Sequence, residues 1–149
     1  DQRLDFKLIV LGKEFKKEPL PFTNARKMLK KHIVHFGYVQ SFSEYANWLW
    51  KADILPVTSN QDFFGASIIE ATYCKNIPLL PNRLAYPEIF NYQHNTNYFY
   101  KNNEELVSML DYSINNFNLL KPCHFQTMVE KFDWENMVKF YDNSFAEII

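Results

Sequence analysis

Residues 53–70 read DILPVTSNQDFFGASIIE, and this segment shows most clearly how the chain is built. Its apolar beginning, residues 53–57, predicts a short buried strand. The polar residues 58–64 predict a loop, and Gly65 is followed by apolar residues at helical spacing over residues 66–74. We therefore expect a strand, a polar loop and a helix, in that order.

The rest of the chain repeats this alternation. Further strands are expected at residues 6–11, 32–36, 77–80 and 98–100. Helices are expected at residues 24–31 with Thr23 as N-cap, at residues 44–50 with Ser43 as N-cap, and at residues 87–90. Two or three more helices are expected over residues 103–149, and the last of them should begin near Trp134. This alternation predicts an α/β fold, a Rossmann-like doubly wound parallel sheet.

The composition favours one folded domain over the whole chain. Of the 149 residues, 47% are hydrophobic and 17% are aromatic, which suits a packed core, and the net charge of −1 argues against a surface built as a whole for nucleic acid. Cys74 and Cys123 lack the spacing of a disulfide scaffold or a zinc site, so we expect a cytoplasmic protein. No apolar run approaches the roughly 20 residues that cross a bilayer. Because the chain starts at Asp1 rather than at Met, we expect a fragment of a longer protein.

Residues 13–31 are locally basic, with seven Lys and Arg residues against Glu14 and Glu18. Such a run is typical of the solvated face of a helix, and a site for a phosphate-rich partner is the alternative. Lys13 follows Gly12 at the end of an expected strand, where a contact with a phosphate is a further alternative.

Parallel sheets of this class bind ligands beyond the carboxyl ends of their strands. In this chain the expected strand ends are followed by Gly12, by Gly37, by the loop 58–64 and by the turn 81–86. The three glycines of the chain, which include Gly65, are expected where the backbone adopts a positive φ or where another group approaches closely.

The start of the helix after Gly65 is the candidate binding site. Unpaired N–H groups of Phe64, Gly65 and Ala66, together with the helix dipole, would favour an anion such as a diphosphate. Asp62 and Glu70 lie on either side, and carboxylates accept strong hydrogen bonds from sugar hydroxyls. Glu70 is equally compatible with an ordinary helix residue or with a partner for a nearby lysine.

Several segments resemble the donor-binding region of GT4-like retaining glycosyltransferases, which have the two-domain GT-B fold. They are residues 53–59, residues 62–71, Pro78-Leu-Leu and Pro87-Glu88, and the Glu-x7-Glu motif of the family corresponds to Asp62-x7-Glu70. More narrowly, the chain resembles the branch that contains the tRNA-queuosine mannosyltransferases. The segments that carry this resemblance are Gly37-Tyr38, residues 62–65, Glu70-Ala71, Tyr73-Cys74 and residues 81–90. The similarity runs from about Phe6 to Phe90.

The resemblance implies a role for each matching residue. Glu70 would bind the ribose hydroxyls of the donor nucleotide. Asp62 would contact the donor sugar and help to hold charge in the transition state. The other matching residues would bind the diphosphate through their backbone (Phe64, Gly65 and Ala66) or line the nucleobase (Gly37 and Tyr38).

The resemblance also implies a reaction. The full protein would transfer a sugar, mannose from GDP-mannose, with retention of configuration and to a queuosine-modified tRNA, and it would need no metal and no cofactor. Residues 1–149 would be the C-terminal nucleotide-sugar-binding domain, inactive alone, since its first strand and the N-terminal acceptor domain would lie upstream. The alternative is a non-catalytic sugar-nucleotide-binding or interaction module. A stand-alone nucleic-acid-binding domain has less support from the overall charge.

Two positions depart from the family pattern. Asp62 is one methylene shorter than the usual Glu, which puts its reach to the sugar in doubt. Lys75 stands where the family commonly has Gly after the helix, so we expect Asn76 to supply the left-handed cap.

Other side chains that invite a functional role are expected to be structural. His35 lies within an apolar strand, where packing or a hydrogen bond is expected in place of general-base chemistry. Tyr45, Trp48 and Trp50 are expected in the core rather than as a stacking platform. Arg83 follows a strand, and facing the site or forming an ion pair are equally open alternatives.

Overall fold

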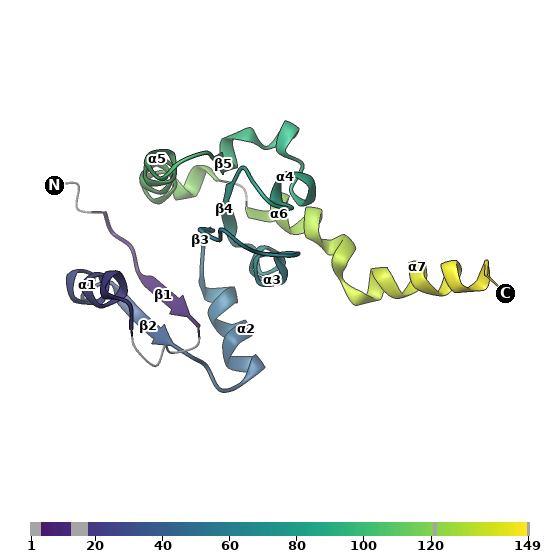
Figure 1. The fold of residues 1–149 in the computed structure, drawn as a ribbon, viewed down its shortest axis with the longest axis horizontal. Coiled ribbons are helices and arrows are strands. Elements are labelled where there is room, and N and C mark those ends of the chain that lie inside the picture. Colours follow the sequence, from purple (N-terminus) through teal and green to yellow (C-terminus); the bar gives the residue numbers. More distant parts are fainter. Residues whose placement is uncertain (1–3, 13–17, 121, 149) are drawn as a thin grey trace. The chain divides into compact units, whose positions relative to one another are not determined.

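The computed structural model describes residues 4–12, 18–120 and 122–148, apart from the side chains of residues 122 and 123. The chain divides into two compact units, Asp1–Ala52 and Asp53–Ile149. Figure 1 labels the helices and strands of both units.

The first unit is a small parallel βαβ arrangement followed by a helix. Its elements are β1 (Leu8–Leu11), α1 (Leu20–Met28), β2 (Ile33–Gly37) and α2 (Phe42–Lys51). β1 and β2 pair in parallel, with Leu11 opposite Gly37 at their carboxyl ends. The helix α1 has no buried residue, so its basic side chains are solvated as the charge pattern indicates.

The second unit contains a three-stranded parallel sheet in the order β3-β4-β5. The strands are β3 (Ile54–Pro56), β4 (Ile77–Pro81) and β5 (Phe99–Tyr100). The helices are α3 (Ala66–Tyr73), α4 (Tyr86–Ile89), α5 (Asn103–Asn115), α6 (Pro122–Val129) and α7 (Trp134–Ala146), and short 3-10 turns are η1 (Tyr92–His94), η2 (Thr96–Tyr98), η3 (Phe117–Leu119) and η4 (Glu130–Phe132). In Figure 1, α5 lies on one side of this sheet, and α3 and α6 lie on the other.

The core of the second unit is centred on β4. Every residue of this strand is buried, because β3 and β5 pair with its two edges and helices cover its faces. Ile77, Leu80, Phe90 and Phe125 are all fully buried at 0% exposure. A strand covered on both faces is expected to be continuously apolar, as this one is.

The predicted fold class is confirmed, since helices alternate with parallel strands in both units. Each expected strand is present, shifted by no more than two residues at either end. The described strands form two separate parallel sheets, one in each unit. That the chain is the C-terminal half of a GT-B glycosyltransferase stays a prediction.

Both predicted N-caps are wrong. Thr23 lies inside α1, whose N-cap is Pro19, and the Thr23 hydroxyl donates to Glu18 Oε2 at 3.0 Å. Ser43 lies inside α2, and Ser41 caps that helix by accepting from the Glu44 N–H at 3.1 Å. Proline in the first turn, here Pro21, marks a helix start as a hydroxyl N-cap does, and two serines so close together cannot be told apart by type.

The expected left-handed cap after α3 is off by one residue. Lys75 adopts φ 71°, whereas the Asn76 side chain is buried and donates to the Ala71 carbonyl at 2.9 Å. The expectation for glycines holds at Gly37, with φ 138°, but fails at Gly12. Gly12 has a negative φ, and a Cβ placed there would meet no atom of the described residues within 4 Å.

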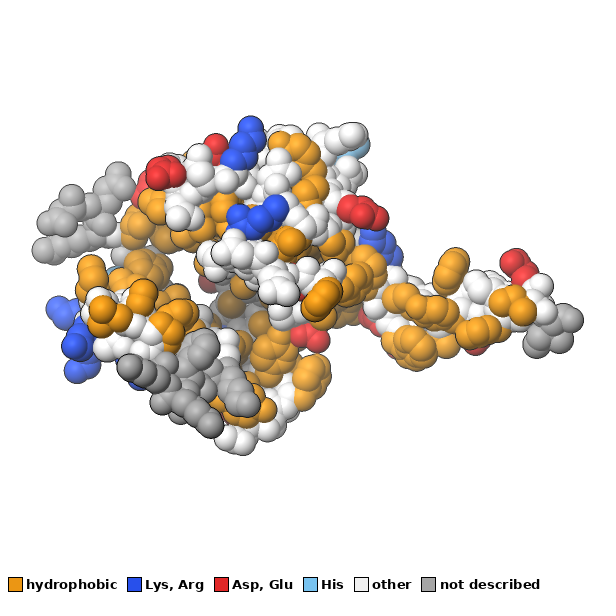
Figure 2. Space-filling model, viewed as in Figure 1, with side chains coloured by type: hydrophobic (Ala, Val, Ile, Leu, Met, Phe, Trp, Pro, Cys, Tyr) orange, Lys and Arg blue, Asp and Glu red, His pale blue; other side chains and the backbone are white. Residues whose placement is uncertain are grey.

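The last helix, α7, begins at Trp134 as expected and carries large hydrophobic side chains that are exposed. Trp134, Phe140 and Phe145 are each more than 60% exposed, and Figure 2 shows hydrophobic side chains along this helix. Among the residues that the structure describes, no helix is both long and apolar enough to cross a membrane.

Candidate functional site

Gly65 ends the loop that follows β3 and is the N-cap of α3. Its φ of 77° is in the left-handed region, which a residue with a Cβ adopts at a cost of about 1–2 kcal/mol. A Cβ at this position would also lie 3.1 Å from Cε1 of Tyr86. Both the backbone conformation and the close approach of the Tyr86 ring therefore require glycine here, as the sequence predicts.

The carboxylate of Asp62 is bonded on both of its oxygens within the protein. Oδ1 accepts a hydrogen bond from the Gly65 N–H at 2.8 Å, and Oδ2 accepts one from the Tyr86 hydroxyl, also at 2.8 Å. Asp62 thus orders the turn into α3, which is a role that the sequence does not indicate.

This arrangement corrects the prediction that three N–H groups at the start of α3 are unpaired. The Gly65 N–H is occupied by Asp62. The N–H groups of Phe64 and Ala66 form no hydrogen bond with any residue in the described part of the chain. These two groups remain as donors at the positive end of the helix dipole, where an anion is favoured.

Tyr86 is the residue that connects Asp62 to the core. Its side chain is 1% exposed at the start of α4, and burial of the ring together with the hydrogen bond to Asp62 raises the pKa of Tyr86 to about 12. A side-chain hydrogen bond with Ser59 acts on the pKa of Tyr86 in the opposite direction. The phenol is therefore neutral throughout the physiological range and keeps its proton for donation to Asp62.

Arg83 bonds to backbone carbonyls rather than to a carboxylate, and the alternative that it faces the site stays a prediction. Its Nε donates to the Ser59 carbonyl at 3.0 Å, and its Nη2 donates to the Thr58 carbonyl at 3.4 Å. Among the described residues the recorded ion pair joins Arg26 to Glu18, and Arg83 takes part in none. These two hydrogen bonds connect the turn after β4, which contains Arg83, to the loop after β3.

Glu70 is an exposed residue on the second turn of α3. The helix buries Ile68, Ile69 and Ala71, so these residues form the face that packs on the core. The charge of Glu70 contributes, after burial, to raising the pKa of Cys74 one turn later. The structure places Asp62 before α3 and Glu70 on α3, and the predicted nucleotide role of Glu70 stays a prediction.

Two aromatic residues follow Asp62 and differ in their surroundings. Phe64 packs edge-to-face on Phe132 with ring centroids 5.3 Å apart, so its side chain is anchored to η4. Phe63 is 95% exposed. Ala66, the first residue of α3, is exposed as well.

Gly37 and Tyr38, the predicted nucleobase loop, belong to the first unit. The Gly37 carbonyl accepts from the Gly12 N–H at 3.1 Å, and Tyr38 is 60% exposed. Because the remaining candidate residues belong to the second unit, the grouping of Gly37 and Tyr38 with them stays a prediction.

Three further predictions concern residues of the first unit. His35 contacts the Gly37 carbonyl at 3.3 Å and packs on Trp48, as expected. Trp50 is 52% exposed, so the expectation that it lies in the core is wrong. Lys13, a candidate phosphate contact, lies outside the described residues.

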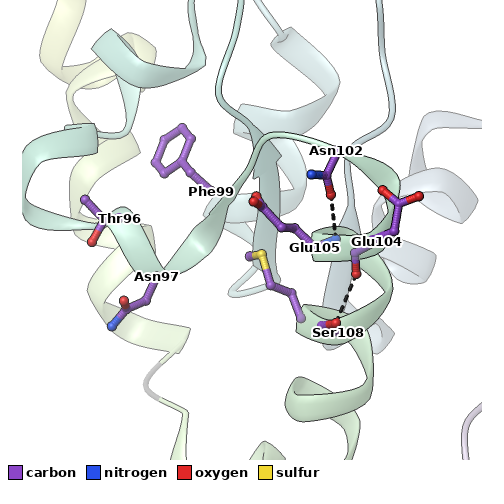
Figure 3. Close-up of a pocket in the computed structure, with 8 residues that line it drawn as sticks. Thr96, Asn97, Phe99, Asn102, Glu104, Glu105 and Ser108 are labelled. Carbon is purple, nitrogen blue, oxygen red and sulfur yellow. Dashed lines mark hydrogen bonds between the residues drawn. The ribbon is translucent and has the colours of Figure 1, made fainter.

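A separate hollow lies beside the start of α5 and holds none of the predicted site residues (Figure 3). Its lining is polar and acidic in part: Thr96, Asn97, Phe99, Asn102, Glu104, Glu105, Ser108 and Met109. The Asn102 side chain caps α5 by accepting from the Glu105 N–H at 2.9 Å, as drawn in Figure 3. This hydrogen bond is of the kind that ordinarily caps the N-terminus of a helix.

The residue that sequence reasoning missed is Tyr86. It lies within residues 81–90, which carry part of the family resemblance, and it precedes a proline at a helix start. Those signals place it near a turn, but its bond to Asp62 spans 24 residues and depends on the tertiary fold.

Comparison with known proteins relates part of the chain to a transferase. The chain is 33% identical over 90 residues to the tRNA-queuosine alpha-mannosyltransferase of Drosophila melanogaster. The match covers 60% of this chain and 24% of that protein, so the chain spans about a quarter of the length of this relative. No family model matches the chain, and no solved structure matches it. The similarity relates the chain to a glycosyltransferase.

Proposed function

We propose that this chain is the donor-binding part of a glycosyltransferase. The observation that carries the proposal is the start of α3, where Asp62 and Tyr86 fix Gly65 in a left-handed conformation. This geometry leaves the N–H groups of Phe64 and Ala66 as donors at a fixed helix start.

A fixed helix start suits the diphosphate of a nucleotide sugar. When the bond between sugar and phosphate breaks, negative charge grows on the leaving diphosphate. Preorganised N–H groups and the helix dipole stabilise that charge without reorganising during the reaction. We propose that the N–H groups of Phe64 and Ala66 bind the diphosphate in this way, without a metal or another cofactor, while Gly65, whose own N–H is held by Asp62, lets the diphosphate approach the main chain closely.

Glu70 is proposed to bind the ribose of the donor. Its carboxylate is exposed one helical turn beyond the proposed diphosphate site, and carboxylates form charge-assisted hydrogen bonds with vicinal hydroxyls. Gly37 and Tyr38 are proposed to line the nucleobase, and Asp62 to act at the sugar end of the donor.

The relative from Drosophila supports a more specific version of the proposal. Its name indicates mannose as the sugar and queuosine in tRNA as the acceptor. We propose transfer of mannose from GDP-mannose to a queuosine-modified tRNA, with retention of configuration. The basic residues on and after α1 (Arg26, Lys27, Lys30 and Lys31) are exposed and compatible with a phosphate-rich acceptor.

Activity is proposed for the full-length protein, with a further GT-B domain that binds the acceptor. The test is to incubate that protein with GDP-mannose and with tRNA that contains or lacks queuosine, using UDP-glucose as the control donor. GDP release and a mannosylated nucleoside, detected by mass spectrometry only with queuosine-containing tRNA, are expected. Absence of turnover with every common nucleotide sugar would contradict the proposal.

One observation favours a second candidate, a non-catalytic module that binds sugar nucleotides. Both oxygens of Asp62 already bond to the protein, which gives this residue a structural use without chemistry. Tight donor binding by the full-length protein, without any turnover, would favour this candidate over the first.

A further inference from the structure

Two loops at the carboxyl ends of neighbouring strands are tied together by side-chain hydrogen bonds. Residues 58–65 follow β3, and residues 82–86 follow β4. From the second loop, Arg83 reaches the carbonyl of Ser59, and the Tyr86 hydroxyl reaches the carboxylate of Asp62. Asp62 in turn holds the Gly65 N–H.

We propose that Tyr86 is a positioning residue: its hydroxyl fixes the carboxylate of Asp62, and that carboxylate fixes the N–H of Gly65 at the start of α3. Tyr86 thus determines where the first free N–H groups of the helix point.

The environment of Tyr86 makes it suited to this role. The ring is 1% exposed and lies where it would contact any Cβ at position 65, at 3.1 Å. It therefore locates the Gly65 backbone by contact and Asp62 by hydrogen bonding. A buried hydroxyl that donates to a carboxylate forms a charge-assisted bond, which is stronger than a neutral one.

The second loop is itself strained, which indicates that these bonds hold it in place. Leu84 adopts φ 58° although it is neither glycine nor asparagine, and its side chain is 43% exposed. A bulky residue in this conformation persists only where its surroundings determine it. The side-chain bonds of Arg83 and Tyr86 lie on either side of Leu84, and the backbone bond from the Asn82 N–H to the Tyr100 carbonyl restrains the same loop.

This geometry gives Asp62 a positioning role in addition to the role proposed for it at the sugar end of the donor. The link from Tyr86 to Gly65 exists whatever the site binds, whereas its effect on donor affinity rests on the proposed function. If the link orders the diphosphate site, then Tyr86 and Asp62 act as one unit. Loss of either bond then loosens the same helix start.

The experiment compares Tyr86→Phe with Tyr73→Phe. The first variant keeps the buried ring and removes only the hydroxyl. The second removes a similar bond, since the Tyr73 hydroxyl donates to Asp133 Oδ2 at 2.9 Å at the far end of α3. Hydrogen exchange at the Gly65 amide is followed by NMR, and affinity for GDP-mannose is measured by calorimetry.

We expect Gly65 exchange to become about tenfold faster in Tyr86→Phe, because a bond to a charged group is lost, and to stay unchanged in Tyr73→Phe. Unchanged Gly65 exchange in a folded Tyr86→Phe protein would overturn the proposal. If Gly65 exchange becomes faster in Tyr86→Phe but the wild-type protein binds no nucleotide, the positioning link stands and the proposed function fails.

A double variant separates positioning from general loosening. In an Asp62→Ala background, Tyr86→Phe should change neither Gly65 exchange nor donor affinity further, because the path through the carboxylate is already broken. Additive effects would overturn the proposal. If Tyr86→Phe does not fold, Asp62→Asn tests the same hydrogen bond by removing the charge of its acceptor. The pKa of Tyr86, followed by NMR, should then fall, and an unchanged pKa would contradict the link.

Discussion

Replacing Gly65 by alanine should destabilise the protein through two effects that the structure separates. The left-handed φ of 77° costs a residue with a Cβ about 1–2 kcal/mol. The new Cβ would lie 3.1 Å from the ring of Tyr86, which is buried and cannot move freely. Overpacking of this kind costs about 1–3 kcal/mol, so we expect the free energy of unfolding to fall by about 2–5 kcal/mol.

Gly12→Ala is the matched control, because Gly12 has a negative φ and open space around its Cβ position. Its free energy of unfolding should change by less than about 1 kcal/mol. Gly65→Asn should fall between the two, since asparagine tolerates the left-handed region but still carries a Cβ. Urea unfolding followed by circular dichroism measures all three. Equal stabilities of Gly65→Ala and Gly12→Ala would refute the reasoning.

Three further predictions concern stability. Lys75→Gly should raise the free energy of unfolding by up to about 1 kcal/mol in urea unfolding, since φ 71° strains the lysine, and a loss of stability would contradict this. Phe125→Ala, at a fully buried position, should cost about 3–5 kcal/mol in the same measurement, and a cost below about 1 kcal/mol would be inconsistent with the described core. The pKa of Tyr86 is raised from 10.0 to about 12 in the folded protein, so between these pH values the folded protein keeps a proton that the unfolded chain loses. The contribution of Tyr86 to the free energy of unfolding is therefore complete below pH 10 and is lost as the pH rises towards 12. Tyr86→Phe should lack this alkaline loss, and the same pH dependence in both proteins would count against the assignment.

Much of the fold follows from local patterns. The apolar run around Leu79 and Leu80 is continuous because β4 is covered on both faces, and such runs are readable without knowing their neighbours. Gly65 was predictable for a similar reason, since a lone glycine between a polar loop and a helix indicates a special backbone position.

The parts that sequence did not predict depend on choices between near-equivalent residues or on long-range contacts. Ser41 and Ser43 are equally good N-caps by type, and packing decides that Ser41 is used. The left-handed residue after α3 is Lys75, because Asn76 is committed to a buried bond with the Ala71 carbonyl.

The candidate site at the start of α3 stays a prediction, and the sequence gives an incomplete account of Asp62 within it. Its residue type suggested a contact with the sugar, and only the fold brings the Tyr86 hydroxyl to the carboxylate across 24 residues. The Gly65 N–H, expected to be free, is occupied for the same reason.

The central claim is that the start of α3 binds a nucleotide diphosphate with Glu70 on the ribose, and calorimetric titration with GDP and GDP-mannose tests it most directly. The full-length wild-type protein is compared with Glu70→Ala and with the control Glu104→Ala, an exposed glutamate in the first turn of α5. Loss of a charge-assisted hydrogen bond should weaken nucleotide binding about tenfold or more in Glu70→Ala and leave Glu104→Ala like wild type. Equal affinity of wild type and Glu70→Ala for the nucleotide would contradict the account.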